Sequence, residues 1–301
     1  MKARPALLPN IFLLITVISW AFNFIAVKEA YREMTPEQVA VLRTVLMWGI
    51  LTLICVATKT SLKMQAGDFW KFAWLGFTSL GVYIVLFLSG MKESSPTTGS
   101  IILQMSPIIV PIVAALKRQE TWNSKAMIGA IAAFIGTALV IYGGSASSSG
   151  NSLLSNMTVL LAATLWGYSV VIMKPMLERY SPLQVLTHSM GGAILPILAY
   201  GLPSTLHLNF AKVSPYAWLM FFHISVISGV VGFLCFYQGV RQVGSSGASI
   251  YQFLVPPTTI LLEIFFLHRA PAVMQLVGLV VVLAGVAYAS RQRFLAQANA
   301  A

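Results

Sequence analysis

The second half of this chain repeats the first half, and the repeat constrains the fold more than any other feature. Four identities recur at an offset of 146 residues: Trp20 and Trp166, Lys28 and Lys174, Pro36 and Pro182, and Gln38 and Gln184. Further along, an offset of 149 pairs Gly90 with Gly239, Pro107 with Pro256, Gly129 with Gly278, and Gly136 with Gly285. Self-similarity over half a chain is typical of a fold built from two copies of one structural unit.

The composition places most of the chain in lipid rather than in water. Of the 301 residues, 57% are hydrophobic and only 9% are charged, whereas soluble domains carry about 25% charged residues. The net charge of +11 could indicate a nucleic-acid partner, but the lysines and arginines stand at the ends of apolar runs. That distribution is typical of membrane topology and argues against nucleic-acid binding.

Ten apolar segments are each long enough to cross a bilayer as a helix of about 20 residues. They cover residues 10–30, 36–56, 69–91, 97–116, 123–143, 153–176, 182–202, 215–238, 247–267 and 272–290. We therefore predict an all-α integral membrane protein with ten transmembrane helices. Residues 1–143 form the first five-helix repeat, residues 144–152 a linker rich in glycine and serine, and residues 153–301 the second repeat.

The basic residues predict the orientation of these helices. Thirteen of the 19 lysines and arginines fall on the side of the two termini, five on the opposite side, and Arg43 lies inside a segment. Because basic loops stay in the cytoplasm, both termini are predicted to be cytoplasmic. Five is an odd number, so the second repeat must be inverted relative to the first. Secondary transporters are built in this way and bind substrate near the membrane midplane, between the repeats.

The ordered set of motifs resembles the EamA-type branch of the drug/metabolite transporter superfamily over essentially the whole chain. The resemblance rests on Trp20, Asn23 and Lys28, on Trp166 and Lys174, on Thr35-Pro36 with Arg43, and on the paired prolines and glycines. The chain departs from the family where Gln119-Glu120 and His268-Arg269 replace the usual Gly-Glu at the ends of helices 4 and 9. The resemblance implies a bacterial inner-membrane exporter of small metabolites, with a cavity lined by helices 1, 3, 4, 6, 8 and 9.

Trp20 and Trp166 are the first candidates for the lining of such a cavity. Each lies about ten residues into its segment, hence about 15 Å deep at about 1.5 Å per residue, far from the interfaces where tryptophan is enriched. Asn23 and Ser169 follow one turn later on the same helix faces. The alternative is that the two indoles only pack between helices.

Six further polar or phenolic side chains fall inside the apolar segments. They are Tyr83, Gln104, Tyr237, Gln238, Tyr251 and Gln252. In lipid, such groups need partners from the protein, from water or from a bound substrate. We predict that they line the cavity, and the alternative is that they form hydrogen bonds between helices.

Prolines interrupt the fourth and ninth segments. Pro107 and Pro111 lie in the fourth, and Pro256 and Pro257 lie in the ninth. Each proline removes a backbone hydrogen bond and kinks its helix. Breaks at corresponding points of inverted repeats predict hinges beside a transport site, and a static packing kink is the alternative.

Arg43 and Glu263 are the two fixed charges well inside the apolar segments. Each lies about 10 Å from the outer end of its helix. Intramembrane charges are usually paired or functional, so we predict that Arg43 and Glu263 couple transport to protons. The alternatives are a static ion pair and a glutamate side chain that extends to the outer interface.

These features predict a secondary transporter that exports amino acids or amphipathic compounds by alternating access. One alternative is a gradient-driven facilitator or exchanger without proton coupling, and another is a membrane-embedded lipid-modifying enzyme. Such an enzyme needs clustered carboxylates, a metal set or a serine–histidine pair, but the chain has one aspartate, scattered histidines and no Walker motif. We therefore expect no enzymatic activity, metal or cofactor. The expected partners are a small-molecule substrate, membrane lipids and protons, with the protein as a monomer.

Overall fold

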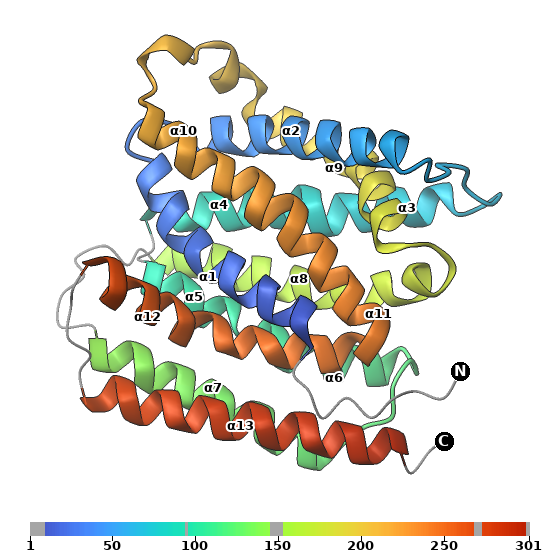
Figure 1. Cartoon of the computed structure of the whole chain (residues 1–301), viewed down its shortest axis with the longest axis vertical. Helices are drawn as coiled ribbons and strands as arrows, with labels where there is room; N and C mark the ends of the chain where they lie inside the picture. Colours follow the sequence, from blue (N-terminus) through green and yellow to red (C-terminus); the bar gives the residue numbers. More distant parts are fainter. Residues whose placement is uncertain (1–9, 94–95, 145–152, 268–272, 299–301) are drawn as a thin grey trace.

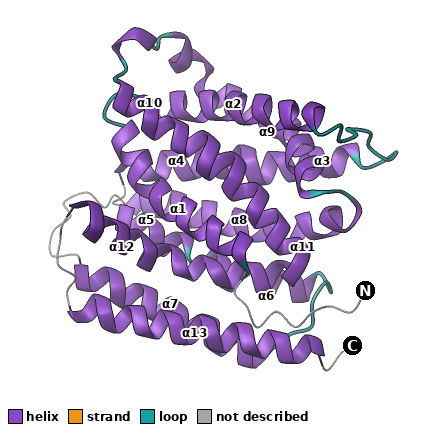
Figure 2. Ribbon diagram, viewed as in Figure 1, coloured by secondary structure: helices purple, strands orange, loops and turns teal. Residues whose placement is uncertain are grey.

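The structure, a computed structural model, describes residues 10–93, 96–144, 153–267 and 273–298, and every regular element within them is helical (Figure 2). The first half contains α1 (Ile11–Ala30), α2 (Pro36–Ala57), α3 (Phe69–Gly76), the π-helix η1 (Phe77–Val82), α4 (Tyr83–Glu93), α5 (Pro96–Leu103), α6 (Ser106–Leu116) and α7 (Ser124–Gly144). The second half contains α8 (Leu153–Arg179), α9 (Pro182–Leu206), the 3-10 helix η2 (Phe210–Lys212), α10 (Pro215–Phe222), the π-helix η3 (His223–Gly232), α11 (Phe233–Ile250), the 3-10 helix η4 (Tyr251–Leu254), α12 (Val255–Leu267) and α13 (Val273–Ala298). Residues 145–152 of the predicted linker lie outside the described residues.

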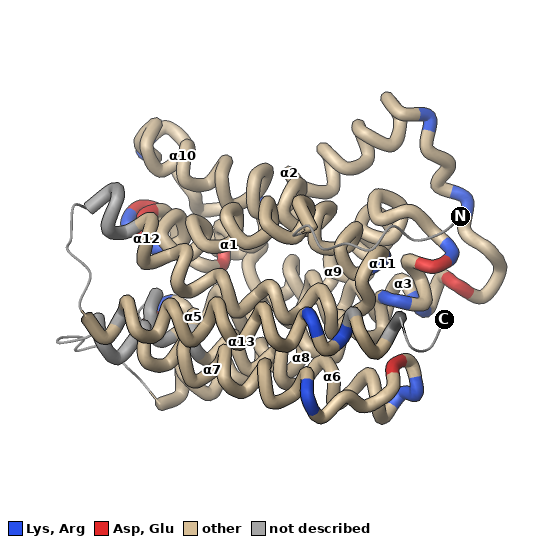
Figure 3. Tube along the Cα trace, turned by 60° about the horizontal axis from the view of Figure 1, so that its bottom comes forward, with Lys and Arg blue, Asp and Glu red and all other residues tan. Residues whose placement is uncertain are grey.

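The helices have the length and composition of membrane spans. Seven described stretches qualify: Ile11–Ala30, Pro36–Ala57, Phe69–Glu93, Leu153–Arg179, Pro182–Leu206, Pro215–Leu262 and Leu276–Arg293. Two shorter apolar helices, Ser106–Leu116 and Ser124–Leu139, accompany them. Charged residues gather at the ends of the bundle, mostly at the end where the termini lie, and leave most of its middle uncharged (Figure 3). The chain is therefore a multi-pass membrane protein.

Two of the repeated sequence motifs are helix caps. The Thr35 side chain accepts a hydrogen bond from the Gln38 backbone N–H at 3.3 Å, and the Gln38 side chain accepts one from the Thr35 N–H at 2.9 Å. Ser181 and Gln184 form the same capping box at the start of α9, with the same two distances. Such reciprocal bonds satisfy backbone donors that a helix start leaves unpaired. The recurring Pro36 and Pro182 occupy the first helical turn, where proline is favoured.

The repeated glycines bring α7 and α13 into contact, and the two helices lie side by side (Figure 1). A Cβ added at Gly136 would lie 2.6 Å from the Val282 backbone nitrogen, and one added at Gly285 would lie 2.6 Å from the Ala133 nitrogen. Small residues allow helix backbones to approach this closely, which is a common way for membrane helices to associate.

The predicted segments 69–91, 97–116, 215–238 and 247–267 are not continuous α-helices in the structure, and breaks had been predicted only in the second and fourth of them. The π-helices η1 and η3 interrupt the first and third of these ranges, a turn at residues 104–105 interrupts the second, and η4 lies in the fourth. The π-helices occupy corresponding places, because an offset of 149 carries residues 77–82 into η3. In a π-helix the backbone hydrogen bonds join residues five positions apart, which widens the helix locally. Such segments occur frequently at functional sites.

The single aspartate joins the two halves at the end of the bundle that holds the termini. Asp68 is 1% exposed and accepts hydrogen bonds from Lys71 Nζ at 2.9 Å, Arg179 Nη1 at 2.9 Å and the Tyr180 hydroxyl at 2.7 Å. The hydrogen bonds from Lys71, Tyr180 and Arg179 lower the pKa of the Asp68 carboxyl to about 2. The cluster therefore fastens the loop before α3 to the end of α8.

Protonation of Asp68 is expected to weaken this contact. Its folded-state pKa lies below the unfolded value of about 3.9, so the stabilisation is present above about pH 4 and is lost as the pH falls towards 2. Thermal unfolding in detergent should show Asp68→Asn to be less stable than the unmodified protein at pH 7 and less sensitive to acid. The exposed Glu178, one residue before Arg179, offers a matched control in Glu178→Gln. Identical pH profiles for Asp68→Asn and the unmodified protein would contradict this role.

Candidate functional site

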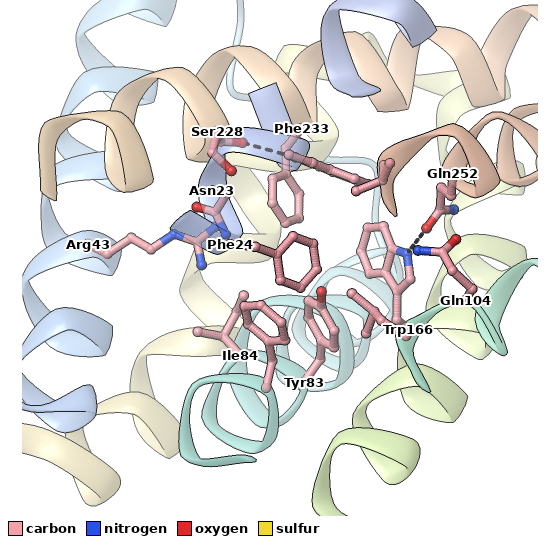
Figure 4. Close-up of a pocket in the computed structure, with 14 residues that line it drawn as sticks. Asn23, Phe24, Arg43, Tyr83, Ile84, Gln104, Trp166, Ser228, Phe233 and Gln252 are labelled. Atoms are coloured by element: carbon pink, nitrogen blue, oxygen red, sulfur yellow. Dashed lines mark hydrogen bonds between the residues drawn. The ribbon is translucent and has the colours of Figure 1, made fainter. Parts of the chain in front are cut away.

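A cavity lies between the two halves of the chain, in the interior of the bundle (Figure 4). It is lined by Trp20, Asn23, Phe24, Arg43, Tyr83, Ile84, Phe87, Leu103, Gln104, Trp166, Ser228, Phe233, Gln252 and Val255. Nine of these residues precede the linker and five follow it, so both repeats build the walls.

The cavity is small, with a volume of about 40 Å³. A buried water needs about 10–15 Å³ of such space, so there is room for a few waters but not for an organic metabolite.

Aromatic rings form one side of the cavity. The rings of Trp20 and Trp166 meet edge to face with centroids 5.7 Å apart, and Tyr83 stacks on Trp166 at 5.1 Å. Phe233 lies against both indoles, at 5.4 Å from Trp20 and 5.6 Å from Trp166. Edge-to-face and offset-stacked geometries are the favourable arrangements of aromatic pairs, so the corresponding tryptophans of the two repeats are packed into one cluster.

Each indole N–H is fixed by one hydrogen bond. Trp20 Nε1 donates to the backbone oxygen of Ser228 in η3 at 3.2 Å, and Trp166 Nε1 donates to Gln252 Oε1 in η4 at 3.0 Å. A Cβ added at Gly232, the last residue of η3, would lie 2.7 Å from Trp20 Nε1, so glycine is required for this approach. The irregular helical segments thus hold both tryptophans.

Four buried polar side chains in the wall each leave one atom without a hydrogen-bond partner. The atoms are Asn23 Oδ1, Arg43 Nε, Gln104 Oε1 and Gln252 Nε2, and the side chains are at most 8% exposed. Buried polar atoms are nearly always satisfied in native proteins, and an unsatisfied one costs about 1–3 kcal/mol. Because all four side chains lie in the wall of one cavity, that cavity is suited to a polar ligand.

The irregular backbone lies directly before the repeated prolines. The turn at residues 104–105 precedes Pro107 near the start of α6, and η4 precedes Pro256 near the start of α12. These breaks place Gln104 and Gln252 in the cavity wall. Pro111 lies inside α6, and Pro257 follows Pro256 in α12.

Six of the ten predicted cavity residues line the cavity, namely Trp20, Asn23, Tyr83, Gln104, Trp166 and Gln252, and four do not. Ser169 is fully buried and donates to the Leu165 backbone oxygen at 2.8 Å, and Tyr237 is also fully buried. Gln238 is half-buried on α11, and the Tyr251 hydroxyl accepts a hydrogen bond from the Asn10 N–H at 3.3 Å.

The structure describes the side chain of only one of the two predicted coupling residues. Arg43 lines the cavity with its guanidinium 5.7 Å from the centre of the Phe233 ring. The Glu263 side chain lies outside the described part of the structure, so its pairing with Arg43 stays a prediction. One turn before it, Thr259 donates to the Ala21 backbone oxygen at 3.1 Å and joins α12 to α1.

Seven residues of the cavity wall were not predicted from the sequence, and all but Ser228 are apolar. The missed residues are Phe24, Ile84, Phe87, Leu103, Ser228, Phe233 and Val255. The repeat held one usable signal, because Ile84 and Phe233 correspond at the offset of 149 and both face the cavity.

Comparison with known proteins gives the same family over both halves. The profile of the EamA-like transporter family matches residues 7–142 and again 153–291. The uncharacterized transporter YyaM of Bacillus subtilis is 24% identical over 259 residues, covering 85% of each chain. A probable terminal-alkyne amino-acid exporter of Streptantibioticus cattleyicolor is 26% identical over 283 residues, covering 93% of this chain and 92% of that protein. One protein crystal structure shares the fold at a TM-score of 0.77 and 15% identity, covering 94% of this chain and 96% of that one. This chain belongs to the EamA-like transporter family.

Proposed function

We propose that this protein is a secondary transporter of the bacterial inner membrane that exports small organic metabolites by alternating access. The observation that carries the proposal is the polar and aromatic cavity enclosed between the two repeats. Secondary transporters bind substrate at this place, beside interrupted helices. The amino-acid exporter among the relatives supports amino acids as one class of substrate.

In the proposed topology, ten helices cross the membrane as two inverted repeats of five, joined by residues 144–152. Contacts between helix ends support this layout. At one end of the bundle, Asn10 Nδ2 donates to Gln242 Oε1 at 2.7 Å. At the other end, Lys28 Nζ donates to the Lys92 backbone oxygen at 3.3 Å. The positive charge at the first end supports cytoplasmic termini.

A charged cluster supports a closed cytoplasmic end. Glu120, which follows α6, forms an ion pair with Arg293 of α13 at 2.8 Å and lies 3.8 Å from Lys174 Nζ of α8. It also accepts a hydrogen bond from the Ser246 N–H at 3.3 Å, next to Gly244, whose φ of 79° favours glycine. We propose that opening towards the cytoplasm separates this cluster, with hinges at Pro107, Pro111, Pro256 and Pro257.

Coupling to protons through Glu263 and Arg43 is part of the proposal. Arg43 in the cavity wall supports it, because a carboxylate that exchanged between Arg43 and a proton would respond to the state of the site. A facilitator without coupling is the second candidate. A lipid-modifying enzyme is the candidate of another class, and in the described ranges no three histidine, cysteine or acidic side chains are grouped so that they could hold a metal ion.

Counterflow in proteoliposomes tests the proposed function. Vesicles preloaded with unlabelled amino acid are expected to take up labelled amino acid faster than empty vesicles, because a carrier returns faster with substrate bound. An imposed pH gradient should drive accumulation if transport is proton-coupled. Flux without stimulation by preloaded substrate would indicate a channel, and absence of flux across an amino-acid and amphiphile panel would reject the proposal.

A further inference from the structure

Arg43 is a buried cation that forms no ion pair among the described residues. Its side chain, on α2, is 4% exposed, and its Nε has no hydrogen-bond partner. None of the five ion pairs in the described part of the chain includes it, and its guanidinium carbon lies 5.7 Å from the centre of the Phe233 ring. A guanidinium stays charged in proteins, and a buried charge without a partner is strongly destabilising. Arg43 therefore needs an anion, which either the predicted pairing with Glu263 or the carboxylate of a bound ligand would supply.

The geometry of a guanidinium selects one kind of anion in particular. Its planar array of N–H donors matches the two oxygens of a carboxylate in a bidentate contact. Asn23 lies beside Arg43 at the same side of the cavity and presents an unpartnered carbonyl oxygen (Figure 4). A donor group next to the ligand carboxylate, such as an ammonium, would satisfy that oxygen.

The rest of the cavity suits an apolar body. Figure 4 shows the rings of Phe24, Tyr83 and Trp166 between Arg43 on one side and the amide of Gln252 on the other. The Gln252 Oε1 atom is occupied by Trp166, so its unpartnered Nε2 is a free donor. A ligand can therefore be charged at the Arg43 side, aromatic or aliphatic in the middle, and weakly polar at its far end.

We propose that the cavity binds amphipathic carboxylates, with the ligand carboxylate on Arg43 and its apolar body among the aromatic rings. The inference rests on the proposed function and names the substrate class of the same site. Amino acids with large side chains and simple aryl or alkyl carboxylates share this chemistry, and Asn23 adds a contact for the ammonium of the former.

Binding to the purified protein in detergent tests the inference separately from transport. The probes are matched sets: L-phenylalanine, its primary amide, phenethylamine and 3-phenylpropionate, with leucine and its amide as the aliphatic pair. Quenching of tryptophan fluorescence is a suitable signal, because Trp20 and Trp166 line the cavity. We expect each carboxylate to bind about tenfold or more tightly than its amide, since hydrogen bonds to charged groups are about twice as strong as neutral ones. Tighter binding of phenylalanine than of 3-phenylpropionate would identify the amino acid as the better ligand.

Variants of Arg43 assign the effect to one side chain. Arg43→Gln should abolish the preference for carboxylate over amide, and Arg43→Lys should retain part of it. Arg32→Gln is the control, because Arg32 is an exposed arginine in an ion pair with Glu29 at the outer end of α1. If Arg43→Gln does not fold, the preference for carboxylate over amide is still measured on the unmodified protein and on Arg43→Lys, and these two values decide the test. Equal binding of carboxylates and amides, an unchanged preference in Arg43→Gln, or no binding by any probe would each overturn the inference. Carboxylate-selective binding without transport would leave it standing while the proposed function failed.

Discussion

Gly192→Ala is expected to disrupt the packing of α9 against α3, whereas Gly191→Ala, one residue earlier, is expected to leave the protein intact. A Cβ at Gly192 would overlap the backbone carbonyl of Ala73 in α3. A Cβ at Gly191 would meet nothing within 4 Å. The neighbouring backbones cannot move apart without separating two helices, so the cost should be at the upper end of overpacking, about 3 kcal/mol or more.

The measurement is thermal unfolding in detergent, with size-exclusion chromatography to report the folded fraction. For chains of 150–250 residues, about 1 kcal/mol corresponds to about 2–4 °C, so in this longer chain Gly192→Ala should lose several degrees or fail to remain monodisperse. Gly76→Ala should behave like Gly192→Ala, because its Cβ would overlap the Ser189 carbonyl from the opposite helix. A Gly192→Ala protein as stable as Gly191→Ala would show that α3 and α9 are farther apart than in this structure.

Trp20→Ala is expected to reduce transport about tenfold or more while leaving a folded protein. The Trp20 ring contacts Trp166, Phe233 and Phe236 at centroid distances of 5.1–5.7 Å. Aromatic pairs of this kind are each worth about 0.5–1.5 kcal/mol, and a tenfold change in rate corresponds to about 1.4 kcal/mol. The change also leaves the Ser228 carbonyl without its donor at the edge of the cavity.

Trp70→Ala is the matched control, because Trp70 on α3 is 76% exposed on the outside of the bundle. Both variants are compared with the unmodified protein for transport in proteoliposomes and for melting temperature in detergent. If Trp20→Ala fails to fold, Trp20→Phe retains the ring contacts and removes only the N–H donor. Normal affinity and turnover in a folded Trp20→Ala protein would mean that the tryptophan cluster is a packing element only.

The helices and the repeat were predictable from the sequence because they depend on composition and spacing. The apolar segments mark the helices, and the capping boxes at Thr35 and Ser181 fix where two of them start. The pairing of Trp20 with Trp166 in one cluster also follows the repeat. These features are local, or they recur at a fixed offset, so a single sequence reveals them.

The details of the cavity were not predictable in the same way. A π-helix differs from an α-helix only in which carbonyl each N–H reaches, and the composition of residues 77–82 does not encode that choice. Ser169 was expected in the wall because it corresponds to Asn23. In the structure its side chain is buried, and its hydroxyl donates a hydrogen bond to the Leu165 backbone oxygen of the same helix. Apolar wall residues such as Phe24 and Phe87 are of the same amino-acid types as core residues, so only the tertiary structure distinguishes wall from core.

The most direct test of alternating access is the accessibility of the cavity from each side of the membrane. Asn23→Cys, introduced after replacement of Cys55 and Cys235 by serine, places one thiol in the cavity wall. A membrane-impermeant thiol reagent is then applied to right-side-out and inside-out vesicles. A second protein adds Glu120→Cys and Arg293→Cys, whose native side chains form an ion pair at 2.8 Å, so that a cross-link between them would hold closed the end that we propose to be cytoplasmic.

We predict that the thiol at position 23 reacts from both sides, and that the cross-link abolishes labelling from the cytoplasmic side while labelling from the outside persists. Labelling from one side only without the cross-link, or cytoplasmic labelling that survives it, would contradict a cavity that opens alternately to the two sides of the membrane.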